Sequence, residues 1–144
     1  MSRNKAAYIA VTNDLAQTVA ANADVTFNKD SPESNVEHCD SVAAVTVRKK
    51  GSYQFDYLVQ GTSDSSLSFA LFEGDNRLPL TSFGSTDESE VKTVTGTGIV
   101  CLDKCDEITL RNVGTGSVEL PANGEVTNAV LRLVLLDQKH DSGH

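Results

Sequence analysis

The side chains best suited to chemistry in this chain are three cysteines and the histidine beside one of them. Cys39 directly follows His38, and three residues separate Cys101 from Cys105. Thiolate and imidazole are the ligands that Zn²⁺ prefers, so these four side chains form a complete ligand set on paper. Two cysteines this close across a hairpin turn can also form a disulfide, provided that their Cβ atoms approach each other.

The order of these residues along the chain argues against a zinc site. Cys101 and Cys105 flank an expected turn that should lie beside the turn at 49–51, whereas Cys39 precedes the strand that leads into that turn. Cys39 is therefore expected about one strand length away, roughly 17–20 Å. We predict no metal site and no cofactor. For Cys101 and Cys105, both a disulfide and two small free thiols remain possible. We expect these two to be paired with each other or protected by the hairpin, whereas Cys39, beside a long polar loop, is expected to be an accessible free thiol. Because the cysteine count is odd, all three are candidates for cross-links between molecules.

Other candidate sites are weaker. Asp87, Glu88 and Glu90 form an acidic run whose oxygens suit calcium, but the spacing fits no EF-hand loop, so a solvated loop is expected. His38 is expected to be a satisfied loop residue rather than a ligand or switch. The sequence contains no phosphate-binding glycine loop, zinc-protease motif or nucleophile elbow. We therefore predict a protein that is not an enzyme, and we assign no catalytic residue.

Composition sets further bounds on function. The chain has 144 residues, enough for one domain with its own core, and 12 basic against 20 acidic residues give a net charge of −8. Such a surface repels nucleic acid and anionic membranes. No apolar run approaches a membrane span. The apolar run 6–11 is too short for a signal peptide, so we expect no export by that route.

The clearest structural signal is the strict alternation in 51–60. Tyr53, Phe55, Tyr57 and Val59 fall on one face, and polar residues occupy most of the other. Alternation of this kind predicts a β-strand with one face against the core.

About ten short strands and no helix are expected, which predicts an all-β, two-sheet jelly-roll sandwich. Gly96, Gly98 and Gly114 are interpreted as turn glycines. We expect an N-terminal arm at 1–6, a jelly-roll domain at 7–136 and a disordered tail at 137–144. The expected strands are 7–12, 17–20, 42–48, 51–60, 67–73, 78–83, 91–102, 107–113, 117–120 and 128–136.

The last expected strand is apolar on both faces. Residues 129, 131, 133 and 135 form one face, while Val130, Arg132, Val134 and Leu136 form the other. One face should meet the opposite sheet, and the simplest cover for the second is another subunit. Arg132 would then need an acid or a carbonyl as its partner, and Asp56 is the strongest candidate.

Short motifs follow one another in a characteristic order between Ala7 and Leu136. They are Ala7-Tyr8-Ile9, Gln17-Thr18-Val19-Ala20, Ala23-Asp24-Val25-Thr26-Phe27, Val36-Glu37-His38, Gly51-Ser52-Tyr53, Phe69-Ala70-Leu71-Phe72, Thr95-Gly96, the segment 106–112 and Asn128-Ala129. In this order they resemble the C-terminal domain of the Bacillus-collagen-like exosporium glycoproteins. The family commonly has glycine at the position of Cys105 and a small residue at that of Cys101, and its collagen-like stalk is absent here.

This resemblance implies a fold of the complement and tumour-necrosis-factor superfamily, whose members are compact homotrimers. The first, the aromatic and the last strands are expected to line the three-fold interface. The implied function is a non-enzymatic assembly module of a bacterial spore surface, exosporium or coat, with other spore-surface proteins as further partners. The alternative is a lectin-like or receptor-binding head, for which Phe83 is the one loop aromatic suited to sugar. The expected interface residues are Tyr8, Asp56, Leu58, Val130, Arg132, Val134 and Leu136.

Overall fold

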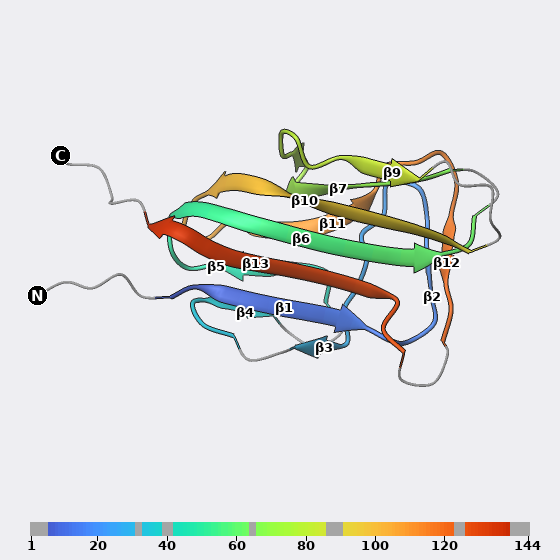
Figure 1. Cartoon of the computed structure of the whole chain (residues 1–144), viewed down its shortest axis with the longest axis horizontal. Coiled ribbons are helices and arrows are strands. Elements are labelled where there is room, and N and C mark those ends of the chain that lie inside the picture. Colours follow the sequence, from blue (N-terminus) through green and yellow to red (C-terminus); the bar gives the residue numbers. More distant parts are fainter. Residues whose placement is uncertain are drawn as a thin grey trace, which may run out of the picture.

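The computed structural model describes residues 6–30, 33–38, 42–63, 66–85, 91–122 and 126–138. These residues form a sandwich of antiparallel sheets, with the first and last strands side by side in the front layer (Figure 1). No helix long and apolar enough to cross a membrane occurs among them. The two-sheet, all-β prediction is confirmed.

The described residues contain thirteen strands, several of them only two or three residues long. The long strands correspond closely to those expected from the sequence. The strands are β1 (Tyr8–Asn13), β2 (Gln17–Val19), β3 (Lys29–Asp30), β4 (Val36–His38), β5 (Val45–Val47), β6 (Gly51–Gly61), β7 (Leu67–Glu73), β8 (Asn76–Arg77), β9 (Phe83–Ser85), β10 (Lys92–Leu102), β11 (Glu107–Asn112), β12 (Val118–Leu120) and β13 (Ala129–Gln138).

Two large sheets make the layers. One has the order β10-β6-β13-β1-β3, and the other has the order β4-β5-β11-β7-β8, with β9 also paired to β7. A small third sheet joins β12 to β2. Strands distant in sequence thus become neighbours: β13 lies between β1 and β6, and pairs antiparallel with both.

The core lies between the large sheets and is built on the aromatic strand β6. Tyr53, Phe55, Tyr57 and Val59 are at most 2% exposed, as the alternation predicted. Burial raises the pKa of the Tyr53 hydroxyl to about 12. It also raises the pKa of the Tyr57 hydroxyl, which lies within hydrogen-bond distance of the Thr81 carbonyl oxygen (2.7 Å).

Gly96 and Gly98 are not turn glycines, which corrects the sequence interpretation. Both lie inside β10 and face the core, opposite Tyr57 and Phe55 respectively. A Cβ atom on Gly96 would lie 2.4 Å from Cζ of Tyr57, and one on Gly98 would lie 2.8 Å from Cε2 of Phe55. The glycines therefore make room for the two rings, a common use of glycine inside a strand.

The segment 78–83 also departs from the expected strand. Leu78 donates its backbone N–H to Leu71, and residues 79 and 80 form a turn in which Leu80 has φ 61°. Thr81 is fully buried, and its hydroxyl lies 2.8 Å from the Leu78 carbonyl oxygen while accepting from the Leu71 N–H at 3.1 Å. Because Leu78 and Thr81 bond to β7 in this irregular way, residues 78–83 cannot pair with β7 as one continuous strand. Within this segment, only β9, which begins at Phe83, pairs with β7 as a strand.

Local pairing explains the smaller differences. The region 28–40, in which no strand was expected, contains the short strands β3 and β4. The alternating segment 23–28 makes only isolated bridges, through Asp24 and Phe27. At the other end, β13 continues to Gln138 after an irregularity between Leu135 and Asp137, two residues into the expected tail.

Candidate assembly surface

The outer face of the β10-β6-β13-β1 sheet carries the expected interface residues. The strand register aligns them in three rows that cross β1, β13, β6 and β10 in that order. We refer to this face, defined by these twelve residues, as the assembly face. The first row is Tyr8, Val134, Gln54 and Ile99; the second is Ala10, Arg132, Asp56 and Thr97; the third is Thr12, Val130, Leu58 and Thr95.

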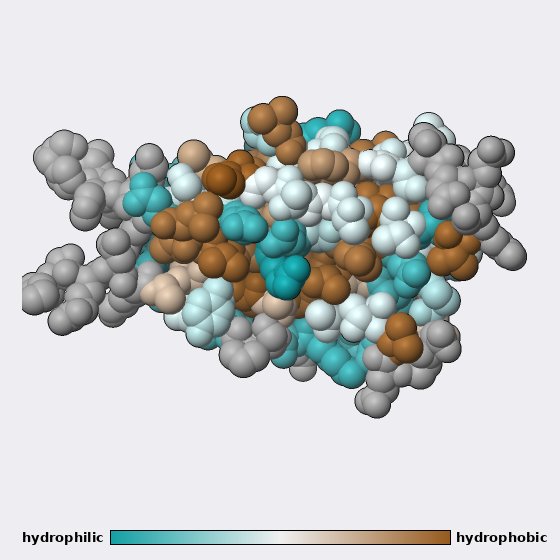
Figure 2. All heavy atoms as spheres, viewed as in Figure 1, coloured by the Kyte–Doolittle hydropathy of each residue, from teal (hydrophilic) through white to brown (hydrophobic). Residues whose placement is uncertain are grey.

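Apolar side chains remain exposed on and beside the assembly face. Tyr8 is 40% exposed, Val134 43% and Ile99 62%, although each lies on a strand whose alternate residues are buried. Leu136, at the irregularity in β13, is 51% exposed. Figure 2 views this face directly and shows brown patches toward the end where the chain termini lie, with a teal area near the middle. An apolar patch rimmed by polar groups marks an interaction surface.

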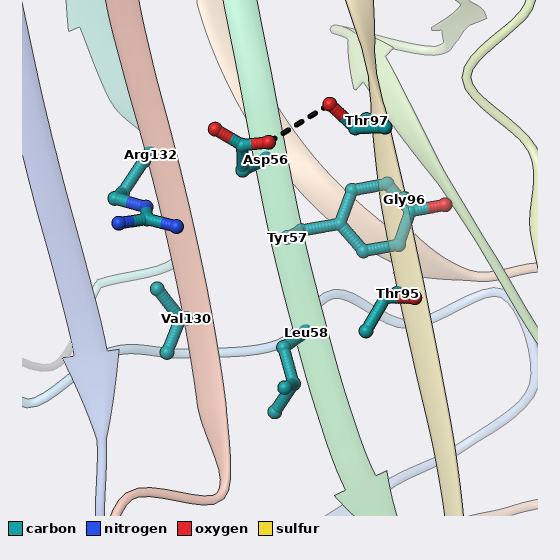
Figure 3. A pocket seen from close by; sticks show the side chains of 8 residues that line it. All are labelled: Asp56, Tyr57, Leu58, Thr95, Gly96, Thr97, Val130 and Arg132. Carbon is teal, nitrogen blue, oxygen red and sulfur yellow. Dashed lines mark hydrogen bonds between the residues drawn. The ribbon is translucent and has the colours of Figure 1, made fainter.

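The second row places a guanidinium and a carboxylate on adjacent strands, but the two groups form no ion pair within the chain. Arg132 is directly opposite Asp56 in the register, yet no ion pair joins its guanidinium to a carboxylate among the described residues. The Thr97 hydroxyl instead donates to Asp56 Oδ1 at 2.8 Å, which turns the carboxylate toward β10 (Figure 3). Within one chain, therefore, the expected Arg132–Asp56 pair does not form, and the side chain of Arg132 is exposed.

A hollow of about 370 Å³ opens on the assembly face between the second and third rows. Apolar side chains of Leu58 and Val130 lie on one side of it, and Arg132 borders it (Figure 3). The short Thr95 and Thr97 side chains on β10 leave this space open. The full lining is Asp56, Tyr57, Leu58, Thr95, Gly96, Thr97, Val130 and Arg132.

No family model and no curated protein sequence matches the chain. Solved structures do match. An Eiger TNF structure from S. frugiperda aligns with a TM-score of 0.72 at 16% identity, over 96% of each chain. The globular domain of zebrafish complement 1qA gives 0.69 at 16% identity, over 92% of this chain and 99% of that one. Murine APRIL at pH 8.5 gives 0.69 at 14% identity, over 92% and 100%.

The fold is a tumour-necrosis-factor- and complement-like jelly roll. At these identities the likeness concerns the fold alone.

The jelly roll brings together six of the seven residues expected at an interface, and Leu136 lies just beyond them in β13. Sequence reasoning missed the other six residues of the face, which are Ala10, Thr12, Gln54, Thr95, Thr97 and Ile99. Ile99 is detectable in hindsight, because it is the one large apolar residue on the outward face of β10, where threonines occupy the preceding outward positions.

The cysteines correct one expectation. Cys101 and Cys105 are both free and exposed, so neither a disulfide between them nor shielding by the hairpin occurs. Cys101 lies opposite Ser52 at the end of β10, with Sγ 3.8 Å from the serine Oγ. Cys105 has φ 75°, a conformation that favours glycine, which the resembled family commonly has there. Cys39 lies outside the described residues.

The remaining candidate ligands offer no metal site in the described part of the jelly roll, where no group of three or more suitable side chains occurs. His38 has both ring nitrogens occupied, by Asp30 and by the Val42 carbonyl oxygen, so it is satisfied as expected, although it ends strand β4 rather than lying in a loop. The acidic run at Asp87, Glu88 and Glu90 lies outside the described residues. Phe83 is 36% exposed, with its ring edge against Tyr57.

Proposed function

We propose that this jelly roll is a non-enzymatic assembly module that forms homotrimers in a bacterial surface layer, a spore exosporium or coat. The observation that carries the proposal is the assembly face itself. Exposed Tyr8 and Val134 lie in one row on β1 and β13, two of the strands that the family resemblance assigns to the three-fold interface, and Ile99 continues that row onto β10. None of the three belongs to the buried core cluster of the chain.

Association would bury the exposed apolar row of the assembly face and would give Arg132 an ion-pair partner. Burial of the exposed apolar row against a neighbour stabilises the complex by removing that surface from water. Arg132, which has no ion-pair partner among the described residues of its own chain, would then face a carboxylate of the neighbour. We take Asp56 of the neighbour as that carboxylate, because it lies in the same central row of the assembly face as Arg132. A guanidinium buried without such a partner would oppose assembly.

The spore-surface assignment rests on the order of motifs from Ala7 to Leu136. The exposed thiols of Cys101 and Cys105 add a route to covalent links between trimers in a layer. Antibodies raised against the protein should label the surface of intact spores of the source organism and leave vegetative cells unlabelled. Labelling of vegetative cells alone would contradict the assignment.

The mass in solution tests assembly directly. Sedimentation equilibrium at micromolar concentration should give three times the chain mass of 15.4 kDa. A clean monomer under these conditions would contradict the proposal.

A glycan array separates this function from that of a sugar-binding head. We expect no glycan to bind, because the Phe83 ring packs against Tyr57 instead of projecting into solvent.

A further inference from the structure

Leu80 is the most exposed large apolar residue that the structure describes, at 91%. It is held in the turn between β8 and β9, which lies at the β10 edge of the sheet that bears the assembly face (top of Figure 1). The Leu80 carbonyl oxygen is 3.9 Å from the position of a Cβ on Gly98, so the turn lies against β10.

The turn presents this leucine rigidly and under strain. Leu80 has φ 61°, a conformation that a leucine adopts rarely and that glycine or asparagine would adopt more easily. Hydrogen bonds fix the backbone on both sides of it, from Leu78 to Leu71 and through the buried Thr81. The sequence therefore keeps a large apolar side chain where the local backbone disfavours it, which points to a use for that side chain.

The hollow on the assembly face is large enough and apolar enough on one side to take such a side chain. Its volume of about 370 Å³ exceeds the roughly 150 Å³ of a cavity that takes up benzene. Leu58 and Val130 offer methyl groups for contact with an apolar side chain. A projection at one edge of a subunit and a hollow on its face cannot meet within one chain, but they meet between copies in a head-to-tail ring.

We propose that Leu80 of each subunit inserts into the hollow beside Leu58 and Val130 of the next subunit, and that three such contacts close the ring. The inference rests on the proposed trimer and specifies how its subunits fit. It makes the contact heterologous: the β10 edge with its turn packs on the face of β6 and β13 of the neighbour. Leu80 then acts as an anchor residue in a pocket, the arrangement that dominates binding energy at interfaces.

Cysteine cross-linking tests the contact. In a background with Cys39, Cys101 and Cys105 changed to serine, Leu80→Cys combined with Val130→Cys should give a covalent trimer after mild oxidation with diamide. Each single-cysteine variant should stay a monomer on a non-reducing gel, because neither thiol then has a partner on the neighbour.

The product can only form between chains. The Leu80 turn packs against β10, and strand β6 separates β10 from β13. Val130 is therefore about two strand spacings, roughly 9–10 Å, from the strand that the turn contacts. A disulfide requires Cα atoms within about 7 Å. Val42→Cys paired with Val130→Cys is the matched control, because Val42 is 44% exposed but bridges to Phe27, away from the assembly face. This pair should not cross-link.

Two outcomes overturn the inference in different ways. If the cysteine pair is trimeric by mass but stays monomeric on the gel, the Leu80 contact is wrong and the trimer stands. If the wild-type chain is monomeric by mass, the trimer and the contact both fail. Leu80→Asp adds an independent measurement: it should raise the dissociation constant by roughly tenfold or more, whereas Leu15→Asp, at a leucine 54% exposed outside the face, should not.

Discussion

Val134→Asp should dissociate the trimer without unfolding the chain. Val134 lies in the centre of the apolar row, between Tyr8 and Gln54, and is 43% exposed. Full burial of a valine side chain contributes about 1.5–3 kcal/mol, so covering the remaining 43% contributes roughly 0.6–1.3 kcal/mol per subunit. A carboxylate in its place would also lose its hydration without a partner, which costs at least the roughly 1–3 kcal/mol of an unpaired neutral polar group.

Together these terms weaken assembly by roughly 2 kcal/mol or more per subunit, or about 6 kcal/mol for three copies. At 1.4 kcal/mol per factor of ten, the trimer dissociation equilibrium should shift by about four orders of magnitude. The folded monomer should change by no more than about 0.5 kcal/mol, because the position is on its surface. Sedimentation velocity over a concentration series measures the first effect, and urea unfolding followed by circular dichroism measures the second.

Val126→Asp is the matched control. Val126 is 55% exposed and precedes β13, outside the three rows of the assembly face, so the variant should sediment like the wild type. If Val134→Asp forms the same trimer as the wild type at the same concentrations, the interface lies elsewhere and the argument from exposed apolar rows is wrong.

Three further changes probe the fold and its surface. Gly96→Ala should lower the free energy of unfolding by about 1–3 kcal/mol, because the new Cβ would lie 2.4 Å from the Tyr57 ring; an unchanged urea midpoint would show that the ring can move aside. Hydrogen bonds from a lysine and an asparagine lower the pKa of Asp14, so its stabilisation is present at neutral pH and is lost as the pH falls below the ordinary aspartate range near 4. In Asp14→Asn, the free energy of unfolding measured in urea should therefore fall less on acidification than it does in the wild type. An equal fall in both proteins would contradict the prediction. Iodoacetamide added to the native protein should label Cys101 and Cys105, which are exposed; mass spectrometry that finds both unlabelled would refute the exposed arrangement of their turn.

Local pattern alone determined the long elements of this protein. The alternation of Tyr53, Phe55 and Tyr57 specifies a strand and its buried face, because a side chain's face depends only on the parity of its position. The apolar character of both faces of β13 likewise indicated that one face needs a cover beyond the chain's own core. Together with the family resemblance, which added the first and the aromatic strands, this reasoning predicted seven interface residues, and six of them share the assembly face.

Features that depend on contacts between distant segments were decided only by the tertiary structure, because a local sequence pattern does not specify those contacts. The expected strand 91–102 already contained Gly96, but the role of this glycine depends on a ring that arrives from another strand, so no local pattern could show that it makes room for Tyr57. The short strands and the turn at Leu80 depend on hydrogen bonds to distant partners, which override local propensity. Cross-strand register, set by pairing between segments far apart in the chain, aligns Tyr8 with Val134 and Ile99 and opens the hollow beside Arg132.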